Sequence, residues 1–134
     1  MEKLEYEKIE ELLIKSVWSD QVARSYLLEN INNDEIFRIL IQVVETSESG
    51  DARMEAAFFL SKCSEKLLES AEKELLTLMD DEWDSVAVHI MVALSRIKSK
   101  EALKKIITNR IKPALPWEAR CLEIYFQGET DGTV

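Results

Sequence analysis

The chain has 134 residues, of which 46% are hydrophobic and 32% charged, with three glycines, two prolines and a formal net charge of −9. This length fits one domain with a real core, and the composition excludes disorder and disfavours an all-β fold, which needs more turn formers. Residues 1–95 hold 21 acidic and 9 basic residues, net −12, whereas residues 96–112 are net +6 and residues 113–134 net −3. The acidity favours a basic partner over nucleic acid or an anionic membrane, although it also suits simple solubility.

Apolar residues at helical spacing predict eight helices in chain order. We expect Ser19 or Asp20, then Asp34, Asp84 and Ser99, to cap helices at their N-termini. The polar tail over 128–134 is expected to fray, which leaves one domain over 1–127. The predicted helices cover approximately residues 3–16, 20–32, 36–44, 52–63, 66–79, 84–97, 99–112 and 116–126.

The sequence contains few features that indicate a cellular compartment. Two cysteines, Cys63 and Cys121, do not form a disulfide framework. Residues 1–7 contain no apolar signal core, and no apolar run approaches the roughly 18 residues of a membrane span. We therefore expect a cytoplasmic protein with no membrane association.

A block of residues recurs along the chain. Residues 52–63 read ARMEAAFFLSKC and residues 86–97 read VAVHIMVALSRI, an offset of 34 without a gap. Weaker copies begin at Ala23 and Ala119, so that the four starts are separated by 29, 34 and 33 residues. A period in this range predicts stacked helix pairs, which usually present surfaces for partners.

The blocks resemble the second helix of a HEAT repeat. The matching residues include Ala52-Arg53, Ala56-Ala57 and Leu60-Ser61, then Asp84, Val86, Ala93-Leu94-Ser95 and Arg96-Ile97. The chain departs from the pattern at Ala87, where the family has arginine, and at Ile90-Met91, where it has two alanines. The resemblance implies an all-α, right-handed α–α superhelix of about eight helices in four antiparallel pairs.

The same resemblance implies a structural role for three arginines. Arg24, Arg53 and Arg120 occupy the family's arginine position, which usually forms ladders with acids of neighbouring repeats. The alanines Ala56, Ala57 and Ala93 suit places where helices approach closely. A fold of this kind says almost nothing about function.

Tryptophans precede three of the predicted second helices. Trp18, Trp83 and Trp117 could be anchors for a partner, because tryptophan is enriched at interface hot spots. Alternatively, each indole could pack its turn against the core, which we prefer for Trp18 and Trp117. Trp83 stands among acids and is left open between the two roles.

The residues give no sign of catalytic or metal-binding chemistry. His89 is the single histidine, and Ala93 stands four residues later, where a second ligand on the same helix face would be. There is no Gly-rich phosphate loop, and a calcium loop is disfavoured because the spaced oxygen ligands are missing. We therefore predict a non-enzymatic protein with no cofactor and no metal.

Acidic residues gather in the predicted turns within helix pairs. No lysine or arginine occurs in residues 39–52 or 74–95. Helix caps and first turns account for Asp20, Asp51 and Asp84, but not for Asp80-Asp81-Glu82. Equivalent turns of a solenoid lie along one edge, so we predict an acidic, partner-binding ridge. Its residues are Glu45, Glu48, Asp51, Asp80, Asp81, Glu82, Trp83 and Asp84.

The leading hypothesis is a protein-binding module. Small size, acidity and a helical-repeat body resemble bacterial immunity proteins, which bind and neutralise a cognate toxin, in many cases a basic nuclease. One alternative is a general HEAT-like scaffold or adaptor that binds a protein or peptide on its concave face. Another is a HEAT-like DNA-base glycosylase, which the net charge of −9 disfavours.

Overall fold

The computed structural model describes residues 2–79 and 84–109, with side chains described within 5–79 and 85–104. This part of the chain is entirely helical and contains no strand, as predicted. No helix in it combines the length and apolar character needed to cross a bilayer. The predicted helix over 116–126 and the tail over 128–134 lie outside the described residues. The helices are α1 (Glu2–Val17), α2 (Gln21–Asn30), α3 (Asp34–Thr46), α4 (Gly50–Leu60), α5 (Glu65–Ser70), α6 (Glu72–Leu78), α7 (Asp84–Arg96) and α8 (Lys100–Asn109).

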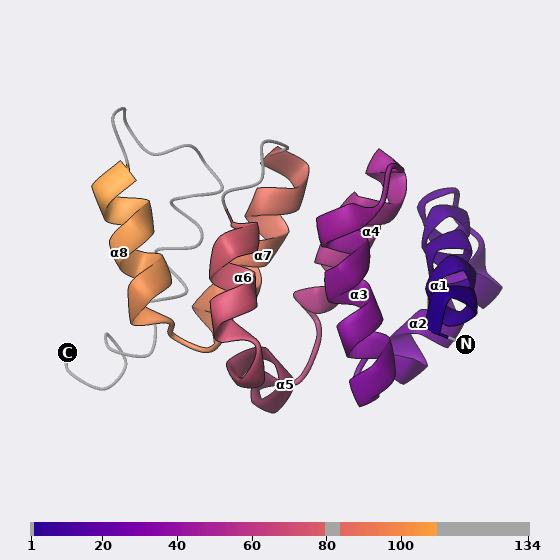
Figure 1. The fold of residues 1–134 in the computed structure, drawn as a ribbon, viewed down its shortest axis with the longest axis horizontal. Helices are drawn as coiled ribbons and strands as arrows, with labels where there is room; N and C mark the ends of the chain where they lie inside the picture. The colour runs from indigo at the N-terminus through magenta and orange to yellow at the C-terminus, as the bar shows by residue number, and fades with distance from the viewer. Residues whose placement is uncertain (1, 80–83, 110–134) are drawn as a thin grey trace.

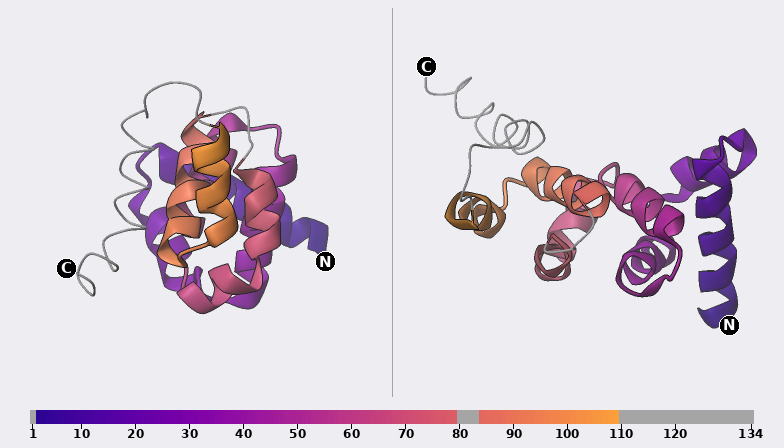
Figure 2. Two further views of the ribbon diagram at one scale, coloured as in Figure 1. Left: turned by 90° about the vertical axis from the view of Figure 1, so that its left-hand side faces the viewer. Right: turned by 90° about the horizontal axis from the view of Figure 1, so that it is seen from above.

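The helices stack in two layers along the long axis of the molecule (Figures 1 and 2). In one layer α3 packs against α6, and in the other α4 packs against α7. The layers join where α3 contacts α4 and α6 contacts α7. At one end α1 contacts α2, α3 and α4, and at the other end α8 contacts α7. The central helices therefore have neighbours on several sides, whereas α2 makes its main contacts with α1 alone.

The core follows the repeated apolar positions. The side chains of Ala56, Ala57 and Ala93 are fully buried, as predicted for residues at close helix approaches. Phe59, two residues before Ser61, and Leu94, directly before Ser95, are also fully buried. Each buried leucine or phenylalanine contributes about 2 kcal/mol by its removal from water. The repeat thus marks the packing positions that hold α4 and α7 together.

The helix caps agree with the sequence in two places and differ in one. The Asp20 side chain accepts from the Ala23 N–H at 3.0 Å, and the Ser99 hydroxyl accepts from the Ala102 N–H at 3.2 Å. The prediction that Asp34 caps the third helix was wrong. Asn33 is the cap, with extended backbone and its side chain 3.1 Å from the Ile36 N–H. Asp34 is instead the first helical residue, where the positive end of the helix dipole stabilises its carboxylate.

The single helix predicted over 66–79 was also wrong, because the chain breaks at Ala71. This residue has φ −118° and ψ 19°, outside the helical region, and separates α5 from α6. Just before it, the Ser70 hydroxyl donates to the Leu67 carbonyl at 2.6 Å, a local bond that competes with continuation of the helix. The break buries Ala71 itself together with Leu68 and Leu75 on either side of it.

Two turns use a left-handed residue that is not glycine. Ser19 has φ 70° and Lys98 has φ 55°. After α1, the Asp20 N–H donates to the Lys15 carbonyl at 3.0 Å and the Ser19 N–H to the Ser16 carbonyl at 3.1 Å, which is the Schellman arrangement. In both turns the next residue, Asp20 or Ser99, already caps the following helix. These two connections are therefore short and tightly bonded.

Candidate functional site

The described part of the predicted ridge lies at the turn between α3 and α4. Glu45 is in the last turn of α3, Glu48 is in the turn, and Asp51 is in the first turn of α4. Glu45 and Glu48 are exposed and Asp51 is half-buried. None of the ion pairs among the described residues involves these three carboxylates. The turn thus presents three negative charges without a lysine or arginine partner in the described structure.

Bonds from α1 hold this turn in place. The Ser47 hydroxyl donates to the Glu10 carboxylate and accepts from the Ser49 N–H at 3.1 Å. The Tyr6 and Thr46 hydroxyls are hydrogen-bonded at 2.9 Å. Ser47 is buried, so these bonds hold the turn on its inner side, while Glu45 and Glu48 are exposed to solvent. Such anchoring lowers the entropy that a partner must remove from the site on binding.

The rest of the predicted ridge is only partly described. Asp80, Asp81, Glu82 and Trp83 lie outside the described residues, and Asp84 is described only as the first residue of α7. The N-terminal ends of α4 and α7 lie at the same edge of the stack (Figure 1). Whether all eight residues form one surface stays a prediction.

A buried polar cluster joins α1, α2 and α4. The Glu55 carboxylate accepts from the Ser16 hydroxyl at 2.5 Å and from the Arg24 guanidinium at 3.2 Å, both through Oε2. Arg24 also donates through Nε to the Ser16 hydroxyl oxygen at 3.3 Å. Glu55 and Ser16 are buried, so the pairing compensates the desolvation of the carboxylate. The prediction that Arg24 pairs with an acid of the neighbouring repeat is confirmed.

For the other two arginines the pairing stays a prediction. Arg53 donates through Nε to the Val44 carbonyl at 3.0 Å, within its own helix pair, and Arg120 lies outside the described residues. A further cross-repeat bond comes from Arg96, which donates to the Ser61 and Cys63 carbonyls at 2.8 and 2.6 Å. These carbonyls lie just after the C-terminal end of α4, where the negative end of the helix dipole stabilises a nearby cation.

Cys63 is buried and structural, as the sequence predicted. Its thiol donates to the Ile31 carbonyl, with the two atoms 3.4 Å apart, one repeat earlier in the chain. Burial raises the pKa of this thiol to about 12, although the nearby Arg96 charge acts to lower it. A thiol with this pKa is neutral at physiological pH and is a poor nucleophile.

His89 packs between the two central helices of its layer. Its ring lies edge-to-face with Phe58, with centroids 5.6 Å apart. Burial lowers the pKa of His89, partly opposed by the Glu55 carboxylate and assisted by Lys62. No cluster of three or more potential metal ligands occurs among the described residues. The ring therefore acts as a half-buried packing group of α7.

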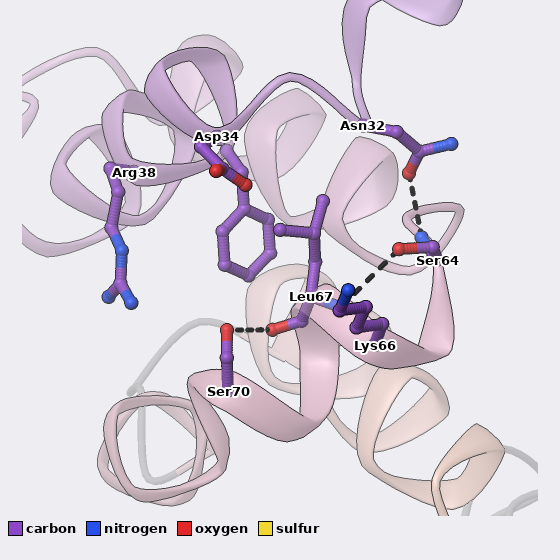
Figure 3. Close-up of a pocket in the computed structure, with 8 residues that line it drawn as sticks. Asn32, Asp34, Arg38, Ser64, Lys66, Leu67 and Ser70 are labelled. Atoms are coloured by element: carbon purple, nitrogen blue, oxygen red, sulfur yellow. Dashed lines mark hydrogen bonds between the residues drawn. The ribbon is translucent and has the colours of Figure 1, made fainter.

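A polar hollow of about 550 Å³ lies between α3 and α5 (Figure 3). Its polar groups largely bond to one another: the Asn32 side chain accepts from the Ser64 N–H at 2.8 Å, and the Ser64 hydroxyl caps Leu67 at 3.3 Å. On its far side Arg38 forms an ion pair with Glu74 of α6 at 2.7 Å. The bond between Asn32 and Ser64 joins the turn before α3 to the turn before α5. The hollow is lined by both acidic and basic side chains, which favour no particular ligand.

Exposed apolar side chains that the sequence reasoning missed occur on α2 and in the turn before it. Trp18, in the turn, is 75% exposed, and Val22 and Tyr26 on α2 are 82% and 38% exposed. The expectation that Trp18 packs its turn against the core was therefore wrong. Val22 and Tyr26 stand four residues apart and so share one side of α2, a spacing that the sequence shows.

Comparisons with models of known protein families, with curated proteins and with solved structures found no match for this chain.

Proposed function

We propose that this protein is a non-catalytic protein-binding module, and most concretely an immunity protein that binds and neutralises a basic toxin such as a nuclease. The observation that carries the proposal is the anchored turn with Glu45, Glu48 and Asp51, unpaired with any base in the described structure. Carboxylates held in this way imitate the phosphates of a nucleic-acid substrate. They also accelerate encounter with a positively charged partner.

The buried polar groups support a binding role. The buried side chains of Ser16, Glu55 and Cys63 each form a bond to a distant part of the chain. We further propose that the stack is a HEAT-like right-handed superhelix of antiparallel pairs. Its cross-repeat bonds support this, since Cys63–Ile31, Ser64–Asn32 and Arg96–Cys63 join residues 32, 32 and 33 positions apart.

A protection experiment tests the function. Basic toxin domains, chosen first from genes adjacent to this one, are each expressed in cells with and without the protein, and growth is followed. We expect protection, and a complex between the purified proteins whose affinity falls as salt is raised. A Glu45→Gln, Glu48→Gln and Asp51→Asn triple variant should slow association, with Glu65→Gln and Glu69→Gln on α5 as an exposed, charge-removing control. Failure of the wild-type protein to protect would overturn the immunity role.

The second candidate is a general scaffold or adaptor that binds a protein or peptide. The exposed apolar side chains of Trp18, Val22 and Tyr26 favour it, because apolar anchors do not require a charged partner. Binding of an uncharged peptide with little salt dependence would support this role. Retention of duplex DNA at physiological salt would instead favour the glycosylase alternative.

A further inference from the structure

We draw no further inference here: the strongest candidate, the side of α2 on which Val22 and Tyr26 are exposed and line a shallow hollow, carries nothing because no feature of the described part of the chain shows what covers it.

Discussion

Helices α2 and α4 both carry Ala-Arg in their first turn, at their third and fourth residues, yet their surroundings differ. Position four of the block is Tyr26 in α2 and Glu55 in α4. Tyr26 is exposed, whereas Glu55 is buried and bonded to α1 and α2. The helix α4 packs against α1, α3 and α7, while α2 has α1 as its main neighbour. One block pattern thus yields a structural helix in the centre and an open surface at the end.

The largest expected effect comes from the core side of this comparison. Phe59→Ala in α4 should lower the free energy of unfolding by about 3–5 kcal/mol, because it leaves a cavity between packed helices. Val22→Ala in α2 should change it by less than about 0.5 kcal/mol, since Val22 is 82% exposed. Urea unfolding of the two variants measures the difference, and similar losses would contradict the contrast between α2 and α4.

The next effect concerns the buried cluster that joins the two helices. Glu55→Ala should cost about 1–3 kcal/mol, because it leaves the partly exposed Arg24 guanidinium without its partner and the buried Ser16 hydroxyl without its acceptor. Arg24→Ala should also destabilise, and the double variant should cost less than the sum of the two. A double-mutant cycle by chemical denaturation measures this coupling. Additive losses would show that the ion pair contributes nothing between repeats.

Cys63 provides a smaller and more local test of burial in the centre. In a Cys121→Ser background, the Cys63 thiol should react with a disulfide reagent at pH 8 at least about tenfold more slowly than in urea-unfolded protein. The reasons are its burial and its pKa of about 12, which keeps the thiol protonated at that pH. Fast reaction of the folded protein would show that the α4–α5 turn opens readily.

The smallest effect is the pH dependence due to His89. Because burial lowers the pKa of His89 in the folded protein below its ordinary value of 6.5, the unfolded chain binds more protons as the pH falls below 6.5. Stability contributed by neutral His89 is therefore present above pH 6.5 and is lost as the pH falls. The wild type should lose more stability between pH 7 and pH 5 than a His89→Gln variant, measured by thermal unfolding. Parallel curves would contradict this.

Much of the scaffold was predictable because it depends on local patterns. Apolar spacing gave the all-α class, and the buried alanines Ala56, Ala57 and Ala93 were assigned to close approaches from the repeat alone. The Arg24 pairing with an acid of the next repeat was predicted through the resemblance and is confirmed. The break at Ala71 was not, because Leu68, Ala71 and Leu75 keep helical spacing through it.

The candidate sites were less predictable than the scaffold. The clustering of Glu45, Glu48 and Asp51 at one turn could be predicted, because all three are close in sequence. The exposure of Trp18 could not, because the same residue before a central helix would have a neighbour to pack against. The left-handed conformation of Ser19 could not be predicted either, because the residue that normally indicates such a conformation in a sequence is glycine.

Except for the break at Ala71, the sequence by itself determined the described helices, their period and the positions of the repeat that are buried, because these depend on spacing within one helix turn or one repeat. The tertiary structure decided which copies of the block are covered on several sides and which is left open. That outcome depends on how many neighbours a helix has in the stack, which no single repeat encodes. Hence the buried Glu55 side chain joins helices, while Tyr26, at the same place in its block, is exposed.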